Sequence, residues 1–150
     1  MKYYFFDSSA IVKLYVPEVG SDKVKEFFKD VSTMNLLSIL SWAEVPSAFF
    51  RKTREIPSTI TFKEAENCLI KFLSDFYNKF YRIDLYDWHF TEVIRLIKNY
   101  SLKSADAIIL SQAISLIKQG ADLTIITSDK NIFEIALQEE IRIINPEDEK

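Results

Sequence analysis

The stretch Leu123-Thr124-Ile125-Ile126-Thr127 is apolar on both of its faces, as a strand at the centre of a parallel sheet should be. A second apolar run, Tyr3-Tyr4-Phe5-Phe6, begins the chain. An acid follows each run, Asp129 after the first and Asp7 after the second. The carboxyl ends of parallel strands meet at one edge of a sheet, so we expect these two acids to lie near each other.

The rest of the chain alternates strand-like runs with helical patterns. The predicted strands are residues 3–6, 35–39, 80–83, 123–127 and 142–145. The predicted helices are residues 8–16, 21–29, 41–54, 61–78, 86–99, 104–118 and 129–138. This alternation predicts an α/β fold, in which helices flank a parallel sheet. A turn that holds Pro57 joins the two helices at residues 41–54 and 61–78, which we expect to form a projecting hairpin.

Length and composition limit the class of protein. A chain of 150 residues, 48% of them hydrophobic, suits one folded domain over residues 1–146, followed by an acidic tail at 147–150. The net charge of −3 argues against a protein that coats nucleic acid without specificity. A single cysteine fits a reducing compartment, and no apolar run resembles a signal peptide or a membrane span. We therefore expect a soluble cytoplasmic protein that makes no contact with a membrane.

Two further acids belong with Asp7 and Asp129. Glu44 and Asp106 fall in the first turn of two predicted helices, and the helix of Glu44 directly follows a predicted strand. Each acid also has a structural explanation. Asp7 and Asp129 can cap helices. Glu44 can form a capping box with Ser41. Asp106 can sit in a helix that Ser104 caps, where the helix dipole favours negative charge.

The combination of four acids points to a metal, even though each acid alone can also serve the start of a helix. Carboxylates that share a partly desolvated crevice repel one another strongly unless a cation neutralises them. Mg²⁺ and Mn²⁺ prefer oxygen ligands, whereas structural zinc prefers histidine and cysteine. Such a cation can polarise a phosphoryl oxygen and lower the pKa of a bound water. The pattern therefore predicts a Mg²⁺ or Mn²⁺ site that serves phosphodiester hydrolysis.

Other catalytic arrangements find little support in the sequence. No Walker lysine loop is present, which disfavours nucleoside triphosphate hydrolysis of that type. The sole histidine, His89, lies beside Trp88 and Phe90, and we expect it to be a structural side chain rather than part of a serine triad.

The segments around the four acids resemble the motifs of a known nuclease family. The stretch Phe6-Asp7-Ser8-Ser9-Ala10-Ile11-Val12-Lys13-Leu14-Tyr15 resembles the opening motif of PIN-domain nucleases. The later segments Ser41-Trp42-Ala43-Glu44-Val45, Ser104-Ala105-Asp106-Ala107-Ile108 and Thr127-Ser128-Asp129 resemble the second, third and fourth motifs. Each motif alone is weak, but all four occur in order across essentially the whole chain. Within the family, the chain looks most like the VapC-type toxins of toxin–antitoxin pairs.

The resemblance implies a three-layer PIN-like fold with a central five-stranded parallel sheet in the order 3-2-1-4-5. It also implies an endoribonuclease that depends on Mg²⁺ or Mn²⁺. Carried over to this chain, Asp7 and Asp106 would be the closest metal ligands, and Glu44 and Asp129 would complete the acidic pocket. Glu44 would orient or deprotonate the attacking water. The resemblance further implies a homodimer and a cognate antitoxin that blocks the crevice.

Several residues around the acids have both a functional and a structural interpretation. Ser9 and Thr127 match small hydroxyl positions near the site, where they can bond a carboxylate or water, or cap a helix locally. Lys103 and Lys130 flank the third and fourth motifs and are candidates for contacts with RNA phosphates, as is Lys13. For each of these lysines, a solvated surface position is the structural alternative.

Two other functions remain open at this point. The chain can be a regulatory or interaction module that keeps the PIN-like fold with weak catalysis, although such a module has no need to maintain like-charge repulsion. It can also be a nuclease of RNA or DNA processing that is not a toxin. The sequence does not identify the RNA target, the antitoxin or the number of metal ions.

Overall fold

The computed structural model describes residues 1–149 and contains one parallel sheet. Its strands are β1 (Lys2–Phe6), β2 (Thr33–Ser38), β3 (Tyr81–Ile83), β4 (Asp122–Ile126) and β5 (Ile143–Ile144). They lie in the order β3-β2-β1-β4-β5, and every neighbouring pair is parallel. The expected order of five strands is therefore confirmed, with the strand of the opening motif at the centre.

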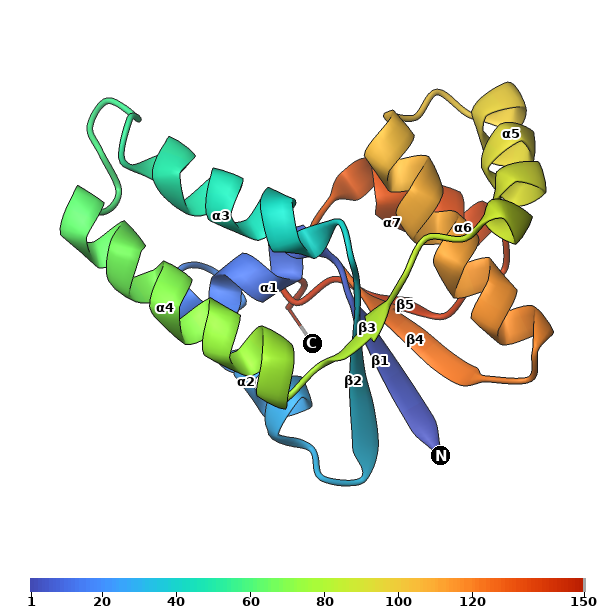
Figure 1. Ribbon diagram of the computed structural model, residues 1–150, viewed down its shortest axis with the longest axis horizontal. Coiled ribbons are helices and arrows are strands. Elements are labelled where there is room, and N and C mark those ends of the chain that lie inside the picture. The colour runs from blue at the N-terminus through green and yellow to red at the C-terminus, as the bar shows by residue number, and fades with distance from the viewer. Residues whose placement is uncertain (150) are drawn as a thin grey trace.

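Helices cover both faces of the sheet, which gives the three layers that were expected. The helices are α1 (Ser8–Tyr15), α2 (Ser21–Lys29), α3 (Ser41–Lys52), α4 (Phe62–Asn78), α5 (Phe90–Asn99), α6 (Ser104–Lys118) and α7 (Lys130–Gln138). Figure 1 shows α1 to α4 on one side of the sheet and α5 to α7 on the other. Helices α3 and α4 run side by side away from the sheet, as the predicted hairpin required.

Alternation along the strands supplies a separate core to each layer. Phe6 of β1 packs with α1 to α4, whereas its neighbour Phe5 packs with α6 and α7. Successive side chains of a strand point to opposite faces, and both phenylalanines are fully buried. A strand that buries both faces in this way is typical of a parallel sheet covered by helices. The apolar run in β1 therefore fixes the place of the first acidic residue, at the end of the central strand.

The start of the predicted helix at residues 86–99 differs from the structure. Residues Asp87–His89 form a single 3₁₀ turn, and α5 begins only at Phe90. His89 is buried, and its Nδ1 accepts a hydrogen bond of 3.0 Å from the Tyr86 N–H. The imidazole thus holds the turn that leads into α5, in agreement with the structural role predicted for this histidine.

The C-terminal segment is attached to the body of the domain. Glu147, the first residue of the predicted acidic tail, accepts a hydrogen bond of 2.6 Å from the Lys13 ammonium. Gly20 has a φ of 86°, and a Cβ there would approach the Pro146 carbonyl oxygen to 2.9 Å. The chain therefore needs glycine at position 20 for the segment to pack closely. Lys150, the last residue of the tail, lies outside the described residues.

Among residues 1–149, no helix is long and apolar enough to cross a membrane.

Candidate active site

Asp7 is fixed at the carboxyl end of β1 by three donors. The Ser9 hydroxyl donates to its Oδ2 at 2.7 Å, the Thr127 hydroxyl at 2.9 Å and the Ser9 N–H at 3.4 Å. The last of these bonds makes Asp7 the N-cap of α1, as predicted. Since all three donors reach Oδ2, the other carboxylate oxygen is turned away from them. The cap therefore orients the side chain without using both of its oxygens.

Glu44 is oriented by a residue from another helix. The Ser8 hydroxyl donates to Glu44 Oε1 at 2.9 Å, which links the first turn of α1 to the first turn of α3. The alternative of a capping box with Ser41 is wrong, because Leu40 is the N-cap of α3 and no side chain caps it. Glu44 points toward Ser8 rather than back along its own helix, so its carboxylate lies with the end of β1.

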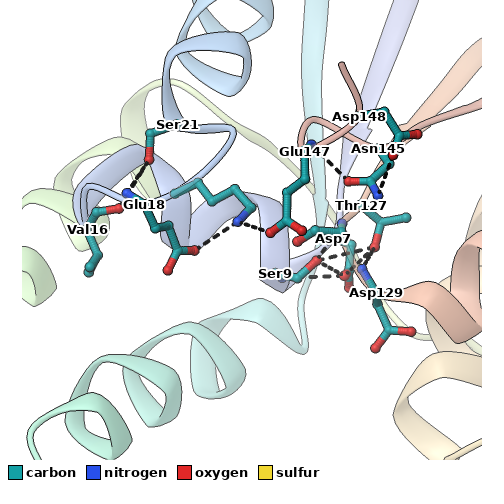
Figure 2. Close-up of polar contacts among 12 residues, drawn as sticks. Asp7, Ser9, Val16, Glu18, Ser21, Thr127, Asp129, Asn145, Glu147 and Asp148 are labelled. Atoms are coloured by element: carbon teal, nitrogen blue, oxygen red, sulfur yellow. Dashed lines mark hydrogen bonds and ion pairs between the residues drawn. The ribbon is translucent and has the colours of Figure 1, made fainter. Parts of the chain in front are cut away.

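Asp129 and Asp106 complete the group from the other side of the sheet. Asp129 caps α7, since its Oδ1 accepts a hydrogen bond of 3.0 Å from the Ile132 N–H. Its own N–H donates to the Thr127 hydroxyl at 3.0 Å. Thr127 therefore connects Asp7 and Asp129, and Figure 2 shows the three side chains together with Ser9. Asp106 lies in the first turn of α6, where Lys103 rather than Ser104 is the N-cap.

The four carboxylates line one pocket at the carboxyl edge of the sheet. The pocket has a volume of about 270 Å³, and its lining includes Asp7, Glu44, Asp106 and Asp129 together with Arg51 and Lys103. With four negative and two positive side chains, its formal charge is −4 + 2 = −2 when all six are ionised. One divalent cation would bring that formal charge to zero. The fold has thus gathered residues that are up to 122 positions apart in the sequence.

The electrostatics of the pocket reflect this concentration of carboxylates. The pKa of Asp106 is raised to about 6, first by burial and then by the negative charges of Asp129, Asp7 and Glu44, against the opposing charge of Lys103. Burial also raises the pKa of Asp7, although hydrogen bonds from Ser9 and Thr127 oppose the change. The pKa of Glu44 is raised mainly by burial, then by the charge of Asp7. Three of the four acids are therefore harder to ionise here than in water.

These shifts predict how the metal-free protein responds to pH. Asp106 binds its proton more tightly in the folded state, so the folded protein holds more protons between about pH 3.9 and about pH 6. The free energy of unfolding contributed by this residue therefore falls as the pH rises through that range. Thermal unfolding in EDTA should show a steeper fall for the wild type than for Asp106→Asn, which lacks the titrating group. Equal slopes in the two proteins would contradict this assignment.

The donor set fits a hard divalent cation. Within residues 1–149, no three acidic, histidine or cysteine side chains already surround a common point as a ready metal cage. Mg²⁺ does not require one, because it takes one or two carboxylates directly and keeps several waters. The hydrogen bonds from Ser8, Ser9, Thr127 and Ile132 each use one oxygen of their carboxylate and leave the other to a ligand. Asp7 and Asp106 stay our predicted direct ligands, with Glu44 and Asp129 as direct or water-mediated partners.

The structure separates the three candidate lysines. Lys103 lines the acidic pocket, whereas Lys130 is exposed and does not. The Lys13 side chain is only 4% exposed, and its ammonium pairs with Glu18 at 3.1 Å and Glu147 at 2.6 Å. In Figure 2, dashed lines join the carboxylates of Glu18 and Glu147 to the same ammonium, which lies between them. Lys13 is therefore an internal ion-pair partner in this fold, and we do not retain it as a phosphate contact.

Of the described residues that line the pocket, Arg51 is the one charged side chain that is not among the candidate site residues chosen from the sequence. It lies seven residues after Glu44 on α3, a separation of about two helical turns that places both side chains on one face. That spacing was the available signal. It was not decisive because Lys52 and Arg54 are equally basic neighbours, and only the packing of α3 shows which of them faces the acids.

Comparison with known proteins identifies a family. A family model described as PIN domain matches residues 4–137. No curated protein sequence matches the chain significantly.

Several solved structures share the fold at low sequence identity. One comes from a toxin–antitoxin complex of Klebsiella pneumoniae, with 19% identity, a TM-score of 0.62, and coverage of 95% of this chain and 97% of the other. VapBC2 of Rickettsia felis, bound to a promoter DNA fragment, gives 16% identity, a TM-score of 0.62, and coverage of 95% and 98%. VapC20 of Mycobacterium tuberculosis, described as a toxin that cleaves the sarcin–ricin loop, gives 12% identity, a TM-score of 0.63, and coverage of 88% and 94%. At these identities the likeness concerns the fold alone.

Proposed function

Because the chain belongs to the PIN domain family, we propose that it is a metal-dependent endoribonuclease and the toxin of a toxin–antitoxin pair. The observation that carries this proposal is the pocket lined by Asp7, Glu44, Asp106 and Asp129. Four carboxylates around a space of about 270 Å³, without histidine or cysteine, favour Mg²⁺ or Mn²⁺ as cofactor. The proposed substrate is RNA, which the protein would meet in the cytoplasm.

In the proposed mechanism, each pocket residue has a separate role. A bound divalent cation would supply charge stabilisation to the phosphoryl group and a water of lowered pKa. Asp7 would hold the cation with the oxygen that Ser9 and Thr127 do not bond, and Asp106 would hold it from α6. Glu44, whose pKa burial raises, would orient the attacking water and accept its proton. Lys103 would contact the phosphate of the substrate from the rim of the pocket.

The test of this proposal is RNA cleavage under controlled metal conditions. The purified protein is incubated with single-stranded and structured RNA in Mg²⁺, in Mn²⁺ or in excess EDTA, and the cleavage sites are mapped by sequencing. We expect defined sites in either metal, loss of cleavage in EDTA, and recovery when metal is restored. Undiminished cleavage in EDTA would reject the metal mechanism. Cleavage of DNA but not RNA would favour a processing nuclease, and binding without cleavage would favour a regulatory module.

The proposed antitoxin partner rests on the family and on the solved complexes. The structures from Klebsiella pneumoniae and Rickettsia felis are described as a toxin–antitoxin complex and as VapBC2. If this chain is also a toxin, a short neighbouring reading frame should encode a small protein that binds it and suppresses its RNA cleavage. A neighbouring product that leaves cleavage unchanged would count against this partner.

The proposed homodimer has support from an exposed apolar surface. Leu85, Tyr86 and Trp88, between β3 and α5, and Phe90, the first residue of α5, are close in the sequence and all exposed. The rings of Tyr86 and Trp88 stack with centroids 4.2 Å apart. Exposed apolar side chains that cluster in this way often mark a protein–protein contact. Sedimentation of the purified chain as a monomer at micromolar concentration would contradict the proposed dimer.

A further inference from the structure

Three basic residues lie in or just after the last turn of α3. The Lys52 ammonium pairs with Glu18 Oε2 at 3.0 Å and lines a neighbouring hollow between α1 and α3. Arg54 follows the end of the helix and is exposed. Arg51 alone lines the acidic pocket, on the same face of α3 as Glu44. The helix therefore directs one specific guanidinium toward the carboxylates.

Among the described residues, Arg51 makes no direct ion pair with the acids of the pocket. Within the part of the chain that the structure describes, its guanidinium makes no ion pair with any carboxylate. By contrast, the charge of Lys103 acts directly on Asp106 and opposes the rise of its pKa. Arg51 is also exposed, so its donors are accessible from solvent. A guanidinium that lines an acidic pocket with its donors free is suited to an anion that enters from outside.

We propose that Arg51 binds the RNA phosphodiester next to the one that is cleaved, an inference that rests on the proposed endoribonuclease function. Its planar guanidinium can donate two parallel hydrogen bonds to the oxygens of one phosphate. The Cα atoms of Arg51 and Glu44 are about 10 Å apart along the axis of α3, because an α-helix rises about 1.5 Å per residue. A phosphate held by Arg51 would lie toward the last turn of α3, whereas Glu44 lies in the first turn. Arg51 would therefore position the strand without taking part in bond cleavage.

This position distinguishes Arg51 from the catalytic carboxylates in kinetic terms. A contact with a neighbouring phosphate is present in both the bound substrate and the transition state, so its loss raises KM and leaves kcat nearly unchanged. A contact with the reacting phosphate would instead lower kcat. Steady-state kinetics can separate the two possibilities, because one changes KM and the other changes kcat.

The experiment compares Arg51→Met with Arg54→Met, a matched control that removes the same charge from the same end of α3. Cleavage of one mapped RNA in Mg²⁺ gives KM and kcat. Binding of that RNA is measured in an Asp7→Asn background, where we expect no cleavage during the titration. For Arg51→Met we expect KM and Kd to rise about tenfold, as for loss of a charge-assisted hydrogen bond. The slope of log affinity against log salt should become shallower by about 0.7.

The controls separate the inference from the proposed function. Arg54→Met should behave as the wild type, and Arg51→Lys should recover part of the affinity, because it keeps the charge but loses the paired donors. If the wild type cleaves RNA and Arg51→Met matches it, the role of Arg51 is wrong and the endoribonuclease function stands. A loss confined to kcat would also overturn the neighbouring-phosphate position. If the wild type neither binds nor cleaves RNA, the proposed function itself fails.

Discussion

Asp7→Asn is expected to reduce metal-dependent RNA cleavage at least about a hundredfold while the fold stays intact, because a metal ion contributes several kcal/mol to such reactions. The side-chain oxygen of Asn can still accept the hydrogen bonds that Ser9 and Thr127 now donate to Asp7 Oδ2. Its amide nitrogen would take the place of the other carboxylate oxygen, which we assign to the metal. The substitution therefore removes the proposed ligand and keeps the cap of α1.

The same variant should be at least as stable as the wild type in the absence of metal. Asp7 is only 5% exposed, and burial raises its pKa, so its ionised form is costly in the folded state. Replacing it by a neutral side chain removes this cost. Thermal unfolding in EDTA and in Mn²⁺ tests both statements. Mn²⁺ should raise the Tm of the wild type and have little effect on Asp7→Asn.

Asp22→Asn is a suitable control for Asp7→Asn, because Asp22 is an exposed residue in the first turn of α2 and does not line the pocket. It should cleave RNA as the wild type does. Full activity of Asp7→Asn would exclude Asp7 as an essential ligand. Loss of activity together with loss of the folded state would instead show that the hydrogen bonds of the cap depend on the carboxylate.

Lys13→Met is expected to lower the free energy of unfolding by about 1.5 kcal/mol, since it removes charge-assisted hydrogen bonds from a buried ammonium to carboxylates that are partly exposed. The Lys13 side chain is 4% exposed and bridges Glu18 to Glu147. Its loss would leave Glu147 without this cation, and Glu18 with Lys52 alone. The C-terminal segment would then lose its attachment to α1. Urea-induced unfolding of the metal-free protein measures the difference.

Lys29→Met provides the control for Lys13→Met, because Lys29 is an exposed residue at the end of α2. Its effect should stay within about 0.5 kcal/mol. At a temperature where Lys13→Met is folded, its RNA affinity should equal that of the wild type, the opposite of the result expected for Arg51→Met. Normal stability with weakened RNA binding would refute the ion-pair role and restore Lys13 as a phosphate contact.

Much of the architecture was predictable because the apolar patterns are local and strong. The runs that became β1 and β4 bury both faces, as their composition indicated. The strand order came from the resemblance of the motifs, and the structure confirms it. The boundaries were less predictable. Residues 142–145 pair only at Ile143–Ile144, and residues 86–99 begin with a 3₁₀ turn held by His89, because tertiary contacts decide how far each element extends.

The site divides in a similar way between local and long-range information. The sequence predicted that Asp7 and Asp129 cap helices, since a cap depends on neighbouring residues. It could not tell that Glu44 bonds to Ser8 instead of forming a box with Ser41, because that choice depends on the packing of α1 against α3. The sequence also gave no means to distinguish Lys13, which is buried, from Arg51, which faces the pocket.

By itself, therefore, the sequence determined the parallel α/β fold, the four acids and their placement at strand ends and helix starts. Those features follow from hydrophobic periodicity and capping, which act over a few residues. Only the tertiary structure decided that Glu44 bonds to Ser8 and that Arg51, rather than Lys13, faces the acids. Hydrogen bonds and ion pairs between distant helices make those choices, and the acids at the ends of β1 and β4 become one pocket only when the strands lie side by side.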